Sequence, residues 1–228
     1  MTGPGLDPVD LHVAALARRL RGPARLRRSM LAETRAGLLD AAAAHRDAAV
    51  AVAEFGSVAE IAPAYQAELT AAQSRRTALL LVALFPAMVL GWDLLWSSGV
   101  AWTGPAPAAV RLLARVQDLV SWGITALAAT LLVLTLRSRA DERRLALAAG
   151  GLGALGAVLC GGTAVAMNLA NLDRTVDMLA THPAALLAIV LSGVALVLVL
   201  ASTTRALRLG VRADHRPVGP SVRRTTGP

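Results

Sequence analysis

The sequence predicts an all-α protein in which a small cytoplasmic helical domain precedes a bundle of four transmembrane helices. Three observations predict this fold: four apolar runs of membrane-spanning length, a polar first third with helical spacing of its apolar residues, and arginines that gather beside only some of the runs. Of the 228 residues, 55% are hydrophobic. Soluble domains average about 45–50% apolar residues, so the excess agrees with membrane helices.

The first two helices of the domain at residues 1–76 are indicated by their start signals and their apolar stripes. Asp7 and Pro8 begin the first helix, because aspartate caps free amides and proline suits the first turn. Gly22 and Pro23 separate it from the second helix. The first stripe consists of Val9, Val13, Leu16 and Leu20. The second face consists of Leu26, Met30, Leu31, Thr34, Leu38 and Ala42. Both have the spacing of a buried helical face.

A third short helix is expected over residues 48–55, ending at Gly56. Ser57 then begins a new helix, since Ser57 and Glu60 have the spacing of a capping box. Pro63 is expected to kink or restart this helix, because proline lacks an N–H donor and crowds the preceding turn. No glycine or proline follows before the first apolar run. A nearly continuous helix would couple the domain mechanically to the membrane; the alternative is a simple tether.

The four apolar runs predict the membrane helices. They lie at about 77–96, 119–136, 145–167 and 184–203, and none has an ionisable residue at its centre. About 20 apolar residues cross a bilayer as a helix, so each run is long enough. The sequence therefore predicts an integral, multi-pass membrane protein bound to lipid.

The distribution of arginine predicts the topology. The chain contains no lysine and has a net charge of +8. Arginines precede the first run, separate the second and third, and follow the fourth: Arg75, Arg76, Arg137, Arg139, Arg143, Arg144, Arg205, Arg208, Arg212, Arg216, Arg223 and Arg224. The other two connections, near 97–116 and 168–183, contain only Arg111, Arg115 and Arg174. Positively charged loops stay in the cytoplasm, so both termini are expected there, at the inner membrane.

The outer end of the first span carries the candidate interfacial residues. Trp92 and Trp96 fit the aromatic belt at the headgroup level. Asp93 is an ionisable residue near a span, which makes it a functional candidate, but its place in the last turn favours an interfacial anchor. An ion pair between Asp93 and Arg115 is a further hypothesis.

Small residues on the third span predict close helix packing. Ala149, Gly153, Ala157 and Gly161 recur every fourth residue, which allows helix backbones to approach closely in lipid. A similar face on the fourth span consists of Ala184, Ala188 and Ser192. These faces predict a compact four-helix bundle or a dimer through the third span. The single cysteine, Cys160, is expected to be a packing residue.

The remaining polar segments give no sign of a catalytic, cofactor or metal site. The outer connection contains Asn168, Asn171, Asp173, Asp177 and His182, whose spacing matches no metal motif. No cofactor is expected. The basic tail at residues 205–228 contains prolines and glycines and is expected to be disordered, with its first arginines near anionic headgroups. No folded motif supports direct nucleic-acid binding.

Several segments of the first third match a known pattern: Leu20–Pro23, Arg27–Glu33, Glu54–Ser57, Glu60–Leu69 and Gln73–Thr77. They resemble the HAAS, or permease prefix, helical domain of actinobacterial membrane proteins, over roughly residues 9–80. Such proteins often lie beside PadR-like transcription regulators and are associated with signalling or regulation. The resemblance implies no catalytic residues, because none are known for that family.

The sequence therefore leaves two main functions open. The first is a non-enzymatic, membrane-anchored regulatory or signalling protein whose domain at residues 1–76 binds a cytoplasmic protein partner. The second is an accessory membrane subunit of a transport complex, with the bundle packed against a permease. A pore or exporter formed by a homo-oligomer is a weaker alternative. An enzyme is not expected, since the sequence contains no Walker loop, nucleophile elbow, zinc motif or paired membrane carboxylates.

Overall fold

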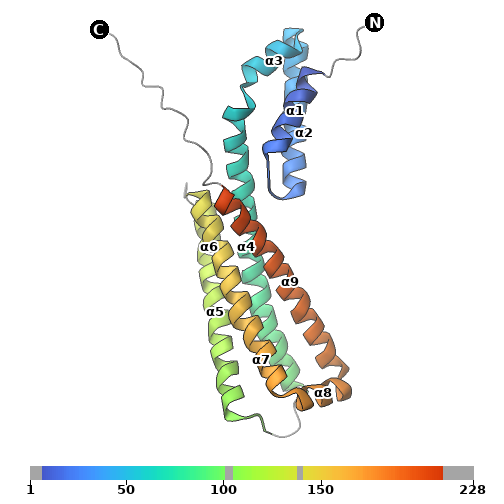
Figure 1. The fold of residues 1–228 in the computed structure, drawn as a ribbon, viewed down its shortest axis with the longest axis vertical. Coiled ribbons are helices and arrows are strands. Elements are labelled where there is room, and N and C mark those ends of the chain that lie inside the picture. Colours follow the sequence, from blue (N-terminus) through green and yellow to red (C-terminus); the bar gives the residue numbers. More distant parts are fainter. Residues whose placement is uncertain (1–6, 101–104, 138–140, 213–228) are drawn as a thin grey trace, which may run out of the picture.

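The computed structural model describes residues 7–100, 105–137 and 141–212, and every regular element within them is a helix (Figure 1). The all-α prediction is therefore confirmed for this part of the chain. The elements are α1 (Pro8–Arg19), α2 (Ala24–His45), α3 (Ala48–Phe55), α4 (Val58–Ser97), α5 (Ala108–Arg137), α6 (Glu142–Gly156), the short π-helix η1 (Ala157–Gly161), α7 (Gly162–Ala170), α8 (Leu172–Thr181) and α9 (Pro183–Arg212).

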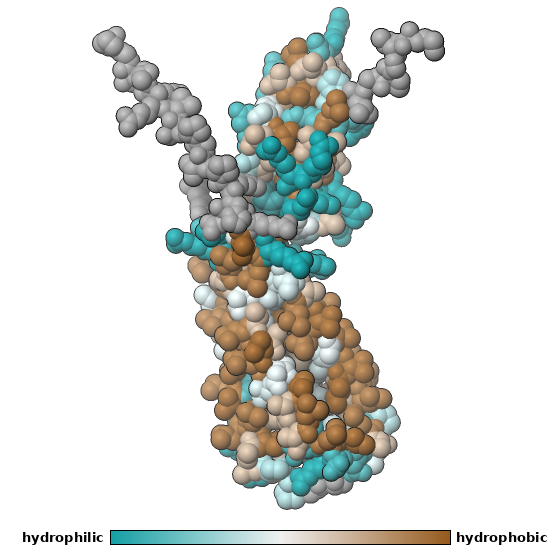
Figure 2. Space-filling view, in the orientation of Figure 1, coloured by the Kyte–Doolittle hydropathy of each residue, from teal (hydrophilic) through white to brown (hydrophobic). Residues whose placement is uncertain are grey.

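Four helices are long and apolar enough to cross a membrane, which is consistent with a multi-pass membrane protein. They are α4, α5, the continuous stretch Glu142–Ala170 through η1, and α9. Figure 2 shows apolar side chains covering the face of this bundle, while hydrophilic side chains gather on the three-helix end and at the opposite end of the molecule. The predicted apolar runs all lie within these four helices.

Helices α1 and α2 pack beside the N-terminal half of α4, and α3 packs on α1 and α2 (Figure 1). Their core contains Leu16 of α1 and Leu20, which caps α1 at its C-terminal end, together with Ala62 and Leu69 of α4. The predicted stripe on α1 lies on this side, with Leu16 and Leu20 fully buried. Burial of these leucines removes apolar surface from water and holds α1 and α2 against α4.

The helix starts follow the predicted signals. The Asp7 carboxylate accepts a hydrogen bond of 2.9 Å from the Val9 amide and caps α1. Gly56 ends α3 with a φ of 100°, a backbone conformation that glycine adopts without strain. The capping box at the start of α4 is confirmed: the Ser57 hydroxyl accepts from the Glu60 amide, and the Glu60 carboxylate accepts from the Ser57 amide.

Of the two outcomes expected at Pro63, the restart is wrong, because α4 continues from Val58 to Ser97 without interruption, while the kink stays a prediction. Packing on both sides of the proline explains this. Ala62 is buried in the domain core, and Tyr65 bonds to α2. Pro63 itself is exposed, so water can reach the carbonyl that its missing N–H leaves unbonded. At about 1.5 Å per residue, the 40 residues of α4 span about 60 Å.

The bundle has its own apolar core, to which all four spans contribute. It contains Leu81 and Phe85 of α4, Ile124 and Ala128 of α5, Ala157 and Cys160 of η1, and Val199 of α9. Cys160 is buried there, with its sulfur 3.4 Å from the Ser121 hydroxyl. The thiol is thus a small packing group, as expected.

Three connecting segments differ from the sequence expectation. Helix α5 begins at Ala108, inside the expected outer connection 97–116. The connection 168–183 contains the helix α8, because Thr175 and Met178 recur at helical spacing and are buried. Helix α9 continues to Arg212, so residues 205–212 are helical rather than disordered. Ala206 and Gly210 are buried, which extends the helix beyond the apolar run. Residues 213–228 of the predicted tail lie outside the described residues.

Candidate functional site

The junction between the two cores is the part of the structure through which the domain and the bundle are connected. Leu69 belongs to the domain core and Leu81 to the bundle core, and both lie on α4. Twelve residues of helix separate them, a rise of about 18 Å. The two cores are thus joined by one uninterrupted helix.

Two polar contacts fix the domain to α4 on the domain side of the junction. The Thr34 and Tyr65 hydroxyls share a hydrogen bond of 2.9 Å. The Arg21 amide donates to Gln66 Oε1 at 2.9 Å, and Gln66 Nε2 donates to the Arg21 carbonyl at 2.8 Å. The α1–α2 connection and the middle of α2 are thus both bonded to α4.

A buried polar cluster joins α4 to α9 on the bundle side of the junction. Gln73 Nε2 donates to the carbonyl and to the hydroxyl of Ser202, both at 3.2 Å. The Thr77 and Ser202 hydroxyls share a bond of 2.8 Å. All three side chains are buried. Buried polar groups are costly when unpaired, so these bonds specify how α4 and α9 align.

The polar cluster lies next to a close approach of α6 and α9. A Cβ on Gly150 would lie 2.7 Å from side-chain atoms of Leu207 and 3.2 Å from its backbone nitrogen. A Cβ on Gly153 would lie 2.2 Å from Thr203 Oγ1. The absence of side chains at these glycines thus permits α6 and α9 to pack closely within one chain.

The other residues of the predicted small face are also placed inside the bundle. Ala157 is buried in the bundle core. Gly161 is half-buried, and a Cβ there would lie 3.1 Å from Leu196 of α9. On α9 the predicted face is displaced by one residue at its start, because Ala184 is exposed and Ala185 is buried. Ala185 packs with Met178 of α8, which accounts for this rotation of α9.

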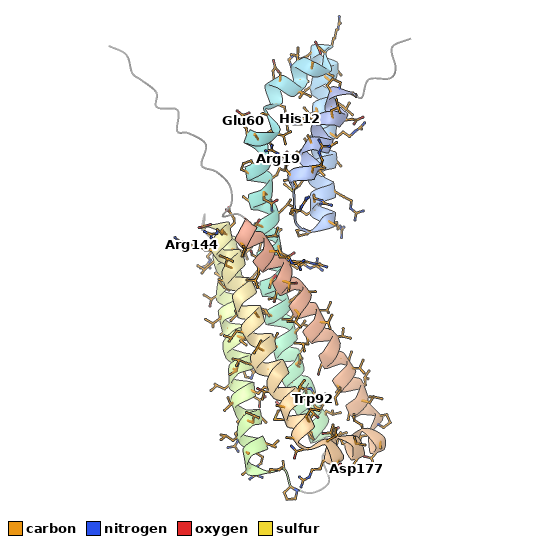
Figure 3. All side chains as sticks on the ribbon, in the orientation of Figure 1. His12, Arg19, Glu60, Trp92, Arg144 and Asp177 are labelled. Atoms are coloured by element: carbon orange, nitrogen blue, oxygen red, sulfur yellow. The ribbon has the colours of Figure 1, made fainter. Side chains whose placement is uncertain are left out.

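Trp92 lies toward the end of the bundle near α8 (Figure 3), and Asp93 and Trp96 follow it near the C-terminal end of α4. Trp92 donates from its indole N–H to the Ser192 hydroxyl at 3.1 Å and so joins α4 to α9. Its ring lies 5.9 Å from that of Trp96, which is exposed. The hypothesised pair of Asp93 and Arg115 does not form, because both side chains lie on exposed faces and neither has an ion-pair partner among the described residues.

Electrostatic effects in the domain are local and lie at its surface. The Ser57 hydroxyl and amide donate to the Glu60 carboxylate and lower the pKa of Glu60 below its usual value. This glutamate lies in the first turn of α4, outside the apolar span. Asp10 accepts from Arg35 at 2.8 Å, and this pair raises the pKa of Arg35. Both effects stabilise the charged forms.

The polar residues of the predicted outer connection are dispersed along α7 and α8. Asn168 and Asn171, the residue between α7 and α8, donate to backbone carbonyls of α7, and Thr175 donates to Asn168. Asp173 and Asp177 are exposed. Within residues 7–100, 105–137 and 141–212, no three His, Cys, Asp or Glu side chains are placed to hold a metal ion.

Sequence reasoning missed the polar cluster at the junction. Its signal is nevertheless present on α4, where Thr70, Gln73, Ser74 and Thr77 recur at helical spacing immediately before an apolar run and are all buried. Ser202 and Thr203 lie correspondingly at the end of the fourth run. No protein-family model, curated protein or solved structure matches the chain.

Proposed function

We propose that this chain is a non-enzymatic, membrane-anchored regulatory or signalling protein whose helical domain, residues 1–76, binds a cytoplasmic protein partner. The observation that carries the proposal is the uninterrupted helix α4, which belongs to the cores of both the domain and the bundle. Binding at the domain that tilts or rotates α4 changes the alignment of α4 with α9 at Gln73 and Ser202. The bundle is then more than an anchor, because it receives the displacement.

The arginine distribution supports placing the domain in the cytoplasm. Arg75 and Arg76 of α4, Arg143 and Arg144 of α6, and Arg205 and Arg208 of α9 lie on the domain side of the four spans. Figure 3 shows Arg144 at this end of the bundle and Trp92 toward the other. Arginine-rich ends remain on the cytoplasmic side of bacterial membranes. The domain and both termini belong there under the proposal.

The distal end of the domain offers the partner-binding surface. Leu11, Val50 and Phe55 are 49%, 41% and 39% exposed. His12, the neighbour of Leu11 in the chain, contacts the Phe55 ring edge-on, with ring centroids 6.0 Å apart, so α1 and α3 meet at this end of the domain. Exposed apolar residues that cluster are typical of protein-binding surfaces.

Affinity capture of the full chain from detergent tests the proposal. Leu11→Glu with Val50→Glu should release a cytoplasmic protein that the parent retains, because two charges then occupy the apolar surface. Ala32→Glu with Ala36→Glu is the matched control, since it adds the same charge at exposed positions of α2. Deletion of residues 1–76 should release the same protein. The proposal would be contradicted if both Leu11→Glu with Val50→Glu and the deletion retained every captured protein.

A second candidate function, an accessory subunit of a transport complex, is favoured by one observation. A groove of about 430 Å³ lies on the outside of the bundle between η1, α7 and α9. It is lined by Ala157, Val158, Gly161, Gly162, Val165, Leu196 and Leu200. Small residues beside such a groove suit a helix of another membrane protein or of a second copy of this chain. Cysteine crosslinking from Val158 in native membranes tests this: a product with a permease supports it, and monomer alone contradicts it.

A further inference from the structure

The α1–α2 tip, defined as residues 18–28, is the most strongly charged surface of the helical domain. Six of its residues are arginines: Arg18, Arg19, Arg21, Arg25, Arg27 and Arg28. No acidic residue occurs between Asp10 and Glu33. Among the described residues none of the six forms an ion pair, although three of them donate to backbone carbonyls. The tip is thus a concentrated positive charge without a compensating partner on the domain.

The tip lies at the end of the domain that faces the bundle (Figure 1). Gly22 packs against Leu69 of α4, where an added Cβ would lie 2.9 Å from the leucine Cβ. The Arg21–Gln66 bonds hold the same loop on α4. Leu69 precedes Arg76, at the start of the apolar span, by seven residues, which corresponds to a rise of about 10 Å. The tip is therefore fixed about one Debye length from the membrane edge.

The headgroup region occupies most of this gap. A bilayer is about 40–45 Å thick with its headgroups and about 30 Å thick without them, which leaves about 5–8 Å on each side. Long arginine side chains on the tip then extend toward the phosphate groups. The start of α2 adds a charge of the same sign, because its first turn contains no acidic residue and has no side-chain cap.

We infer that the α1–α2 tip binds the anionic phospholipid headgroups of the membrane that the bundle spans. The carrying observations are the unpaired arginines, their exposure and their fixed height above the apolar span. The tip thereby gives the domain a second contact with the membrane. Helix α4 is then held both by the bundle and by the tip. This inference concerns lipid alone and does not depend on the proposed protein partner.

Lipid-specific fluorescence quenching on the full chain tests the inference. Ser29, which is exposed beside the tip, is replaced by cysteine in a Cys160→Ser background and labelled with a fluorophore. The protein is reconstituted in nanodiscs of phosphatidylcholine and phosphatidylglycerol. Traces of either lipid carry a nitroxide high on the acyl chain. The ratio of quenching by labelled phosphatidylglycerol to quenching by labelled phosphatidylcholine measures local enrichment of anionic lipid.

The expected enrichment in the parent is about fivefold or more, since one arginine near an anionic surface contributes about that factor. Arg25→Gln with Arg28→Gln should lower the ratio severalfold, because two of the six arginines are lost. High salt should bring the ratio close to one, because screening shortens the reach of the charges. Arg35→Gln with Arg46→Gln is the matched control and should keep the parent ratio. It removes the same charge from α2 and from the residue that caps α2 at its C-terminal end, both away from the tip.

Several outcomes overturn the inference. A ratio of one in the parent means that the tip attracts no anionic lipid, and no quenching by either lipid means that it does not reach the membrane. An unchanged ratio in the variant Arg25→Gln with Arg28→Gln means that the arginines at the ends of the spans, and not the tip, attract the anionic lipid. If the labelled tip binds single-stranded RNA and the quenching ratio is one, the tip binds nucleic acid and not lipid. Helicity and thermal unfolding of each variant show that the domain remains folded.

Discussion

Replacement of Gly153 by alanine tests whether α6 and α9 pack as closely as the structure shows. The added Cβ would lie 2.2 Å from Thr203 Oγ1, far below contact distance. Either Thr203 leaves its rotamer or the helices move apart, and overpacking of this kind costs about 1–3 kcal/mol. Thr203 Oγ1 is buried without a hydrogen-bond partner in the described structure, so removal of this hydroxyl sacrifices no bond. Thr203→Ala should therefore restore stability to Gly153→Ala.

The neighbouring glycine provides the matched control. Gly151 lies on the exposed side of α6, and a Cβ there would meet no atom within 4 Å. Gly151→Ala gains the same helix propensity, about 1 kcal/mol, as Gly153→Ala does. The difference in stability between the two variants thus isolates the contact with Thr203.

Unfolding by SDS in mixed micelles, followed by circular dichroism, measures this difference. We expect Gly153→Ala to be about 1–3 kcal/mol less stable than Gly151→Ala. The double variant with Thr203→Ala should regain most of the loss, which appears as a coupling energy in a double-mutant cycle. Equal stability of the two alanine variants, or a Thr203→Ala that gives no rescue, would refute the close packing of α6 on α9.

Three further predictions concern the junction and the domain. Gln73→Leu should destabilise the same SDS transition by about 1–3 kcal/mol, since the Ser202 carbonyl and hydroxyl lose a buried donor; an unchanged midpoint would contradict this. Tyr65→Phe should cost the domain about 0.5–1.5 kcal/mol in thermal unfolding through loss of the bond to Thr34, and Thr34→Val should add little to it. Folding lowers the pKa of Glu60, so its contribution to the free energy of unfolding is complete above the unfolded pKa and is lost as pH falls through the folded pKa. Glu60→Gln should therefore reduce the loss of stability at acid pH. Parallel curves of stability against pH for the parent and the variant would argue against this.

The helices of this chain were predictable because their signals are local. The cap at Asp7, the glycine after α3 and the Ser57–Glu60 box each act over a few residues, so sequence spacing suffices to find them. The apolar runs give the spans for the same reason, since length and composition determine whether a helix suits a bilayer.

The predictions that were wrong concern features that depend on neighbours distant in sequence. Pro63 does not interrupt α4, because the packing of Ala62 and Tyr65 on α1 and α2 outweighs the loss of one backbone bond. The start of the buried face on α9 differs by one residue, because Met178 of α8 packs on Ala185. The hypothesised ion pair of Asp93 and Arg115 does not form, because spacing along the chain does not determine which way each helix is rotated. Helix rotation is set by tertiary contacts, and one sequence does not contain them explicitly.

The polar composition of the junction bears directly on whether a displacement can be transmitted. Apolar contacts such as those around Leu81 tolerate sliding, since they have no preferred direction. Hydrogen bonds between Gln73, Thr77 and Ser202 are directional, and a rotation of α4 by a fraction of a turn breaks them together. Because all three side chains are buried, water does not readily replace the broken donors and acceptors. The junction therefore favours discrete alignments of α4 and α9 over a continuum, and this is the property that a signal passing from the domain to the bundle requires.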